Sequence, residues 1–284
     1  MNLALIKGRE TPNLFSFLKY LNERRKSDML YYKRFAALKK IMKYQALDTF
    51  FQPIVDLKTE ETFAFEALNR PGMVNLFATP DVFYEFVGQT NIVFDFECFC
   101  RNLSLQRYID QPQDGIDTTD FVLFLNIHPH VLLDKNYHSG ETLQLLRELG
   151  IQPQQVVFEL TERSAVTDFE EFERVLSHYR AQGYRIAIDD VGSGYNSLKT
   201  LIYLKPEFIK IDRSLVQNID QNRTGQQLIA LISDYAEQSQ TKIIAEGIER
   251  VEELKFLQEM GIHYAQGYAL GKPSKEIKRG YFPE

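Results

Sequence analysis

Six short apolar runs in this sequence end on side chains that could bind a metal ion or move a proton. These side chains are Glu66, Asn126, Glu159, Asp189 with the adjacent Asp190, Lys210 and Glu246. Apart from the lysine they are hard oxygen donors, and the set contains neither Cys nor His. Such a set suits Mg²⁺ or Mn²⁺ rather than Zn²⁺. The residue types therefore indicate a site for hard divalent cations.

The balance of charge in this set predicts more than one ion. Carboxylates that meet at one place repel one another and raise each other's pKa unless cations lie among them. One divalent ion would leave excess negative charge, whereas two nearly balance it. Adjacent Asp189 and Asp190 could give one carboxylate to each ion or let one carboxylate bridge both. Paired ions about 3.5–4 Å apart clamp the oxygens of an in-line phosphoryl displacement, so the set indicates phosphoester hydrolysis.

Lys210 has a separate expected role in this chemistry. It would stand beside the attacking water as an electrostatic partner or proton acceptor, with its pKa lowered by the neighbouring metal charge.

The apolar runs themselves are typical of strands buried on both faces, rich in Val, Ile, Leu and Phe. Most are separated by about 20 residues with a helical period and capping signals, which gives a repeating strand and helix unit. Such units close into a (β/α)₈ TIM-type barrel, in which the carboxyl ends of the strands meet on one face. A single acid at a strand end more often caps a helix or pairs on the surface. The repetition at successive strand ends favours a shared site instead.

The chain resembles the EAL-domain family of cyclic-di-GMP phosphodiesterases from about Gln52 to Pro273. The tripeptide alone, Glu66-Ala67-Leu68, is a weak signal, but it is one of several ordered motifs with the family's spacing. In chain order they are QPIV at Gln52, EALNR at Glu66, the strand end at Asn126, ELTE at Glu159, DDVGSGYNSL at Asp189, KID at Lys210, EGIE at Glu246 and QGYALGKP at Gln266.

This resemblance implies a role for each matching residue. The implied metal ligands are Glu66, Asn126, Glu159, Asp189, Asp190 and Glu246. Lys210 matches the catalytic lysine. Glu66 and Glu249 are also expected to be catalytic, with Glu249 at the periphery of the metal site. Gln52 and Arg70 match positions that contact the dinucleotide, and Gln266 one near the reacting phosphate. Glu162 matches a glutamate that anchors the loop after Asp190, and Asp212 an acid beside the lysine strand.

The resemblance also implies an activity and a fold. The expected enzyme hydrolyses cyclic di-GMP to linear 5′-pGpG with two Mg²⁺ or Mn²⁺ ions, is inhibited by Ca²⁺ and forms a homodimer. Its barrel has a first strand antiparallel to the others. One alternative is a catalytically silent cyclic-di-GMP receptor that signals through a dimer or partner interface, although such members usually lack a ligand and this chain lacks none. A barrel metalloenzyme for another phosphoester would leave Gln52 and Arg70 unexplained.

Two departures from the family pattern concern the loops. Val191 stands where the family usually has Phe, which we expect to affect the rate through the following loop more than the reaction. The stretch Asn69-Arg70-Pro71 replaces the more usual aliphatic residue before the arginine and tryptophan after it.

Length and composition predict a cytoplasmic enzyme with one barrel. The chain has 284 residues, which suits a barrel of about 250 residues plus an extension. No apolar run approaches a membrane span, and the N-terminus lacks the apolar core of a signal peptide. Cys98 and Cys100 are expected to be buried free thiols, and His128 and His130 to serve a loop rather than a metal.

Charge divides the chain into a basic extension, residues 1–45, and an acidic barrel, residues 46–284. The extension carries 11 Lys and Arg against 3 Asp and Glu, while the remainder carries 22 against 36. The acidic barrel suits metal ions and disfavours DNA or RNA as a partner. In the extension, apolar residues recur at helical spacing, which predicts two amphipathic helices separated near Glu23 to Asp28. The periodic residues are Leu14, Phe17, Leu18, Leu21, Phe35, Leu38 and Met42.

We expect these helices to pack on the barrel through Leu14, Phe17, Leu21, Phe35 and Leu38. The alternative is a weak contact with an anionic membrane or a partner protein.

Overall fold

The computed structural model describes most of the chain. It covers residues 14–72, 75–111, 117–127, 141–161, 169–192 and 197–283.

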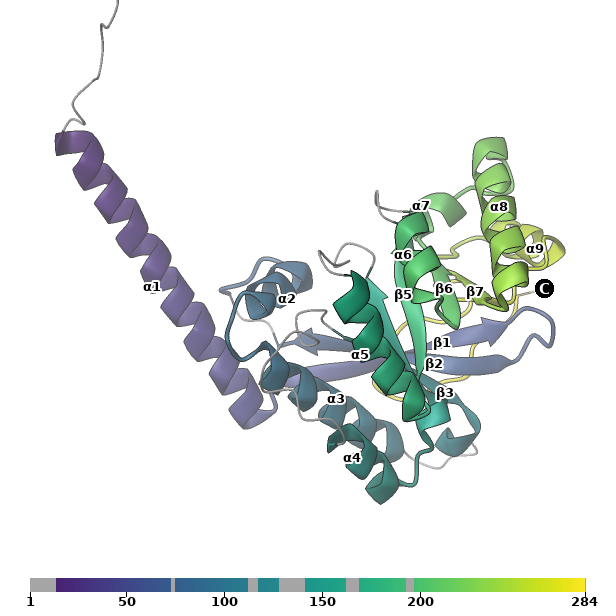
Figure 1. Cartoon of the computed structure of the whole chain (residues 1–284), viewed down its shortest axis with the longest axis horizontal. Coiled ribbons are helices and arrows are strands. Elements are labelled where there is room, and N and C mark those ends of the chain that lie inside the picture. Colours follow the sequence, from purple (N-terminus) through teal and green to yellow (C-terminus); the bar gives the residue numbers. More distant parts are fainter. Residues whose placement is uncertain are drawn as a thin grey trace, which may run out of the picture.

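Eight strands form a closed barrel in sequence order (Figure 1). They are β1 (Leu47–Asp56), β2 (Thr62–Pro71), β3 (Val122–Asn126), β4 (Val156–Thr161), β5 (Arg185–Val191), β6 (Phe208–Ile211), β7 (Lys242–Ala245) and β8 (Tyr264–Ala265). Strand β1 is antiparallel to both of its neighbours, β2 and β8. The remaining neighbours are parallel. The predicted TIM-type barrel with an antiparallel first strand is confirmed.

Helices surround this barrel in the described parts of the chain. The α-helices are α1 (Leu14–Tyr44), α2 (Pro80–Gly88), α3 (Val93–Ile109), α4 (Glu141–Leu149), α5 (Phe169–Ala181), α6 (Ser197–Leu204), α7 (Arg213–Val216), α8 (Arg223–Ser239) and α9 (Val251–Glu259). Two 3₁₀ turns, η1 (Thr118–Asp120) and η3 (Pro153–Gln155), precede β3 and β4. Local sequence fixes several helix ends. Thr79 accepts a hydrogen bond from the amide of Val82, and Pro80 occupies the first turn of α2, both of which favour helix initiation there.

The barrel interior is closed on one side of the site by a layer of buried side chains, which we call the plug. The plug consists of Ile54, Ala64, Phe124, Val157, Ala187, Phe208 and Ile244. A second and larger apolar cluster lies between the strands and the helices outside them. Because inward positions of a small barrel are filled by side chains, the plug leaves only the carboxyl ends of the parallel strands open for chemistry.

The N-terminal extension is one continuous helix, α1, so the predicted break near Glu23 to Asp28 is wrong. Residues 22–28 carry charged and polar side chains but neither Gly nor Pro, and all of them are compatible with a helix. A polar interval interrupts the apolar pattern without ending the backbone hydrogen bonds. The interval was therefore misread as a boundary.

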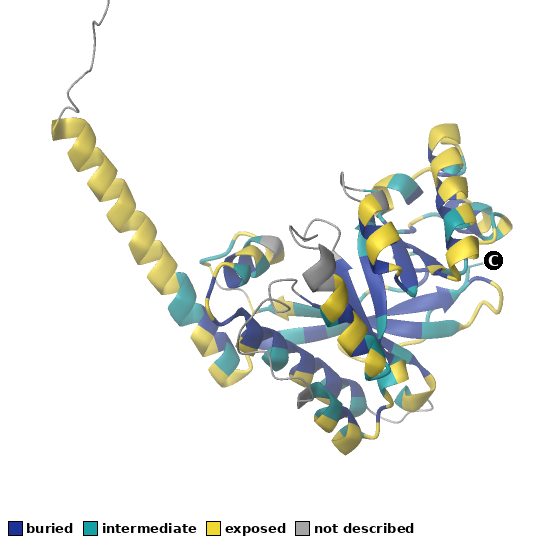
Figure 2. Ribbon diagram, viewed as in Figure 1, coloured by how far each residue is buried: buried dark blue, intermediate teal, exposed yellow. Residues whose placement is uncertain are grey.

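Only the second half of α1 packs as expected. Leu38 and Ile41 are buried, and Phe35 and Met42 contact the main core. Tyr31 lies edge-on to Phe86 of α2, with ring centroids 5.2 Å apart. In contrast, residues 14–33 are exposed throughout (Figure 2), so the expected packing of Leu14, Phe17 and Leu21 on the barrel is wrong.

Two further expectations concern thiols and membranes. Within the described part of the chain, neither Cys98 nor Cys100 forms a disulfide; Cys100 is buried and Cys98 partly so. Burial, and next the charge of Glu97, raises the pKa of the Cys100 thiol well above its usual value. Among the described residues, no helix has the length and apolar character needed to cross a bilayer.

Candidate metal centre

The predicted site residues form one layer of the barrel, which we call the ligand layer. In each parallel strand the site residue lies two positions after a plug residue: Ala64 and Glu66, Phe124 and Asn126, Val157 and Glu159, Ala187 and Asp189, Phe208 and Lys210, and Ile244 and Glu246. Since side chains alternate between the faces of a strand, two positions further along keeps the side chain inside the barrel. Gln52 precedes Ile54 because β1 runs the other way, and Gln266 follows Tyr264.

Lys210 occupies the centre of the ligand layer. Its Nζ lies 2.7 Å from Glu159 Oε1 and 2.8 Å from Glu246 Oε1. The same atom is 3.3 Å from Asp189 Oδ1 and 3.4 Å from Glu66 Oε2. The side chain of Lys210 is only 1% exposed. Carboxylates from four strands thus converge on one buried cation, so these strand ends lie together at one place.

The pKa of Lys210 follows from these neighbours. Burial alone would lower it, but the charges of Asp189, Glu159, Glu246 and Glu66 together outweigh burial and raise the pKa well above the usual value. The predicted lowering concerns Lys210 beside bound metal ions, so it stays a prediction.

Glu66 is held by two amides. Nε2 of Gln266 donates to Glu66 Oε2 at 2.6 Å, and Nδ2 of Asn126 donates to Glu66 Oε1 at 3.3 Å. Burial raises the pKa of Glu66, but the charge of Lys210 and the two amide hydrogen bonds outweigh burial, so the net shift is downward. Glu66 is therefore kept ionised and oriented.

Two other carboxylates of the ligand layer, Glu159 and Glu246, differ from Glu66 in the direction of their pKa shift. Burial, and next the charge of Glu66, raises the pKa of Glu159; burial, and next the charge of Asp189, raises that of Glu246. Oε2 of Glu159 and Oε1 of Gln266 are buried and accept no hydrogen bond from the described residues. Buried acceptors without donors are costly unless a cation binds them. This donor set fits divalent ions, as the sequence indicated.

A bulge in β5 explains how adjacent acids reach the same side. The pairing of β5 with β6 shifts between Ile188 and Val191, and Asp190 has a left-handed φ of 59°. In a regular strand Asp189 and Asp190 would point to opposite faces. Here carboxylate oxygens of Asp189, Asp190 and Glu246 lie within 4.8 Å of one another. The bulge thus creates a group of three acids that could hold an ion.

The proposed substrate residues lie in or beside this layer. Gln52 is buried, and its Nε2 donates to the carbonyl oxygen of Gly271 at 3.0 Å. Arg70, at the end of β2, is exposed, with its guanidinium 5.9 Å from the centre of the Phe50 ring.

The two peripheral acids make their closest described contacts elsewhere. Glu249 is 3.0 Å from Arg213, and its side chain is 44% exposed. Asp212 accepts a hydrogen bond from the amide of Ser214 at 2.9 Å and caps α7. Neither of these two contacts involves Lys210. Glu162, His128 and His130 lie outside the described residues, as does most of the loop after Gly192.

Two residues that shape this region, Phe50 and Gly267, were not predicted from the sequence. The ring centre of Phe50 lies 5.9 Å from the Arg70 guanidinium and 5.8 Å from Nζ of Lys275. The spacing of two between Phe50 and Gln52 was the available signal in the sequence. Gly267 follows Gln266, and a Cβ there would meet the carbonyl oxygen of Ile248 at 2.1 Å. Only glycine permits this close approach, which fixes the backbone that carries Gln266.

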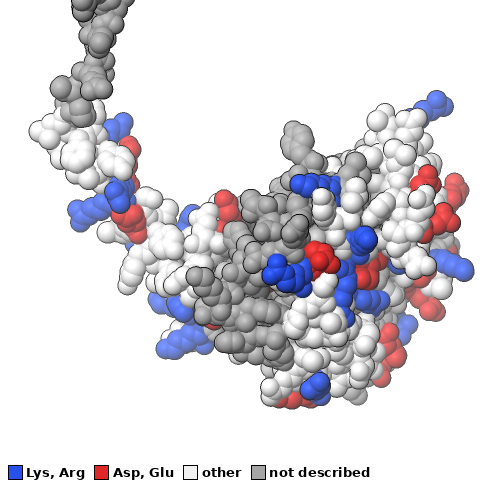
Figure 3. Space-filling view, viewed as in Figure 1, with Lys and Arg blue, Asp and Glu red and all other residues white. Residues whose placement is uncertain are grey.

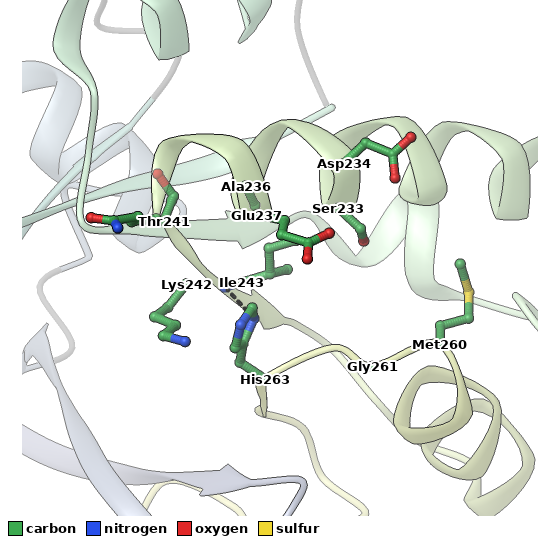
Figure 4. Close-up of a pocket in the computed structure, with 11 residues that line it drawn as sticks. Ser233, Asp234, Ala236, Glu237, Thr241, Lys242, Ile243, Met260, Gly261 and His263 are labelled. Carbon is green, nitrogen blue, oxygen red and sulfur yellow. Dashed lines mark hydrogen bonds between the residues drawn. The ribbon is translucent and has the colours of Figure 1, made fainter.

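A separate cavity of about 580 Å³ lies near the amino ends of β7 and β8 (Figure 4). Its lining includes Lys242, His263 and Glu237, and Nδ1 of His263 accepts a hydrogen bond from the amide of Ile243 at 3.3 Å. These strand ends are opposite the ligand layer. The cavity is therefore distinct from the candidate metal centre.

Known proteins resemble this chain in both sequence and fold. The EAL domain family model matches residues 36–273. PdeA of Escherichia coli strain K12, a probable cyclic di-GMP phosphodiesterase, is 31% identical over 195 residues, which cover 69% of this chain. The chain spans only 26% of the length of PdeA.

Solved structures agree with this comparison. The EAL enzyme Bd1971, with cAMP and cyclic-di-GMP bound, has a TM-score of 0.77 at 25% identity, and the match covers 93% of this chain and 74% of that one. BlrP1 of Klebsiella pneumoniae, in a manganese and cy-diGMP complex, has a TM-score of 0.67 at 28% identity, over 83% of this chain and 58% of that one. The family match extends over most of the sequence, so the chain belongs to the EAL domain family.

Proposed function

We propose that residues 46–284 hydrolyse cyclic di-GMP to linear 5′-pGpG with two Mg²⁺ or Mn²⁺ ions, and that residues 1–45 form an accessory extension. The observation that carries this proposal is the ligand layer, in which four carboxylates surround Lys210 and two buried acceptor oxygens receive no hydrogen bond from the described residues. Relatives named for cyclic di-GMP hydrolysis and a neighbour with manganese and cy-diGMP support it.

Metal ions would be held by the oxygen donors of the ligand layer: Glu66, Asn126, Glu159, Asp189, Asp190 and Glu246. Asp189, Asp190 and Glu246 supply the closest group of carboxylate oxygens. When bound, the ions would activate a water and neutralise charge on the phosphoryl oxygens. Hard oxygen ligands from rigid strand ends suit this task.

Lys210 would act on the attacking water and on the developing negative charge. Its Nζ is fixed by Glu159 and Glu246 at 2.7 and 2.8 Å, so it needs no reorganisation during the reaction. A buried ammonium held in this way can donate to an oxygen that gains charge. Because four carboxylates surround its Nζ, we assign it an electrostatic role ahead of proton acceptance.

Gln52, Arg70 and Gln266 would position the dinucleotide. Gln266 already binds Glu66 through Nε2, and its buried Oε1 remains available as an acceptor. Arg70 is exposed near the carboxyl ends of the strands, where a guanidinium can bind phosphate or a guanine edge. The plug closes the barrel below them, so substrate would approach from the mouth alone.

Product analysis tests this proposal. Purified full-length chain is incubated with cyclic di-GMP and Mn²⁺ or Mg²⁺, and the nucleotides are resolved by chromatography, with Glu246→Gln and the exposed Glu259→Gln as the variant and its matched control. We expect pGpG from the wild type and from Glu259→Gln, and none from Glu246→Gln. Cyclic di-GMP that binds but is not consumed would instead support a silent receptor. Homodimer formation and cytoplasmic action stay predictions.

A further inference from the structure

The first twenty described residues of α1 extend away from the barrel, and the contact of Tyr31 with Phe86 of α2 lies near the end of this stretch. We call residues 14–33 the arm; all of them are exposed, and the arm extends away from the barrel in Figures 1 and 2. A helix of this size is about 30 Å long. Contacts with the rest of the chain gather at the other end of α1, where Arg34 donates to the carbonyl oxygen of Leu76 and Leu38 is buried.

The tip of the arm is apolar. The exposed fractions of Leu14, Phe17, Leu18 and Leu21 are 70%, 52%, 54% and 42%. Figure 3 shows pale side chains gathered at this end of the helix. Large apolar side chains that cluster on a surface mark an interaction site, because their exposure to water is unfavourable.

A cationic band follows the apolar tip. Arg24, Arg25 and Lys26 come one turn after Leu21. The whole arm contains five basic and two acidic side chains, a surplus of three positive charges. Tyr20 and Tyr32 are also exposed, at 54% and 71%. Leucine and aromatic side chains close to Arg and Lys are the residue types of helices that bind at a membrane surface.

A second arm is a poor partner for this surface. Starting at Leu14, a coiled-coil seam would run through Phe17 or Leu18 and then Leu21. After two turns either seam reaches Arg24 or Arg25 and then Asp28. Pairing would bury these charges, and the positive surplus of each arm would repel the other. Charge complementarity therefore favours an anionic surface over a second copy.

We propose that the arm docks on an anionic lipid surface, with Leu14, Phe17 and Leu18 at the boundary between headgroups and acyl chains. Arg24, Arg25 and Lys26 would contact the lipid phosphates from the next turn. The proposal is independent of hydrolysis in the barrel, because the arm lies outside the ligand layer. It predicts a peripheral attachment rather than a membrane span.

Vesicle sedimentation tests the proposal with the full-length chain. Phosphatidylcholine vesicles are compared with mixed phosphatidylcholine and phosphatidylglycerol vesicles. We expect sedimentation with the mixed vesicles only. Combining Arg24→Glu, Arg25→Glu and Lys26→Glu should lower the fraction bound about ten-fold or more, since each cation near the surface adds attraction. Phe17→Asp with Leu21→Asp should have a similar effect. The exposed positions predict unchanged melting temperatures for both variants.

A matched control separates the arm from net charge. Arg223→Glu, Lys242→Glu and Lys255→Glu change the same charge on exposed barrel positions and should leave vesicle binding within about two-fold of the wild type. Equal loss in this control, or equal sedimentation of both arm variants and the wild type, would overturn the proposal. So would a dimer that Phe17→Asp with Leu21→Asp converts to a monomer while no form binds vesicles. Hydrolysis in vesicle-free solution should be the same in all variants, which keeps this test separate from the proposed activity.

Discussion

Nζ of Lys210 lies 2.7 Å from Oε1 of Glu159, and both side chains are almost fully buried, with 1% and 0% exposed. Glu159 has no compensating hydrogen bond at Oε2 from the described residues. The charge of Lys210 lowers the pKa of Glu159, but burial and the charge of Glu66 outweigh it, so the net shift of this pKa is upward. The proposed divalent cations would bind the same group of carboxylates that surrounds Lys210.

The first prediction concerns this shared charge. Lys210→Met leaves the carboxylates without their cation, and removing one partner of a buried ion pair costs about 3–5 kcal/mol of unfolding free energy. We therefore expect a clear loss of stability in EDTA. Mn²⁺ should raise the melting temperature of Lys210→Met more than that of the wild type, because the ion replaces the lost charge. The exposed Lys255→Met serves as the control.

Urea unfolding in EDTA measures the loss of unfolding free energy. Scanning calorimetry with and without Mn²⁺ measures the melting temperatures. Equal stability of Lys210→Met and wild type in EDTA would show that the carboxylates are neutral by protonation and do not depend on Lys210.

The second prediction separates substrate binding from turnover. Lys210→Ala should keep the affinity for cyclic di-GMP within about three-fold of the wild type and lose most turnover, since its interaction strengthens as charge develops. Titration calorimetry and initial rates report the two quantities separately. A collapse of binding with kcat unchanged would make Lys210 a ground-state phosphate contact.

The third prediction concerns the backbone behind Gln266. In Gly267→Ala the new Cβ would lie 2.1 Å from the carbonyl oxygen of Ile248, which is main chain and cannot rotate away. We expect a loss of about 1–3 kcal/mol or more in unfolding free energy, and slower hydrolysis because Gln266 orients Glu66.

Gly261→Ala is the matched control for this change. Gly261 has a positive φ, +78°, unlike Gly267, and a Cβ there has nothing within 4 Å, so only backbone strain of about 1–2 kcal/mol applies. Urea unfolding and initial rates compare the two variants. Equal rates in both would contradict the positioning role of Gly267.

The fourth prediction concerns pH and the cavity below the barrel. Burial, and next the charge of Lys242, lowers the pKa of His263, while Asp56 opposes the shift. The unfolded chain therefore takes up a proton at this residue before the folded chain does. Stability from His263 is present above about pH 6.5 and is lost as pH falls through that value towards the folded pKa.

His263→Gln removes the titrating group, and its amide oxygen can still accept from the Ile243 amide. Unfolding by urea at several pH values between about 7.5 and 5.5 compares variant and wild type. We expect a shallower decline in the variant; identical slopes would show that His263 contributes nothing to the pH dependence.

Much of the barrel could be predicted because continuous apolar runs and residue type are local features of the sequence. The run at Val156–Thr161 is mostly apolar and contains the acid Glu159, and it forms β4 as expected. By contrast β8, Tyr264–Ala265, is too short to leave an apolar pattern. The bulge at Asp190 depends on how β5 pairs with β6, which only the tertiary fold sets.

The extension shows the same limit from the other side. Its apolar spacing correctly indicated helix and the packing of Leu38. Continuity through residues 22–28, and the exposure of Leu14 and Phe17, depend on where the barrel surface ends. The helical period alone does not tell how far along the helix the barrel surface extends.

The fifth prediction tests the metal assignment most directly. Mn²⁺ is titrated into the full-length chain by calorimetry, and the initial rate of cyclic di-GMP hydrolysis is measured at the same ion concentrations. We predict two bound ions per chain, activity that rises with their binding, and inhibition when Ca²⁺ replaces Mn²⁺ because its looser coordination spoils near-octahedral geometry. Glu66→Ala, Asp189→Ala and Glu246→Ala should each lose binding and at least about 100-fold in rate. Full activity in EDTA, or near-wild-type rates in any of these variants, would contradict a metal-dependent ligand layer.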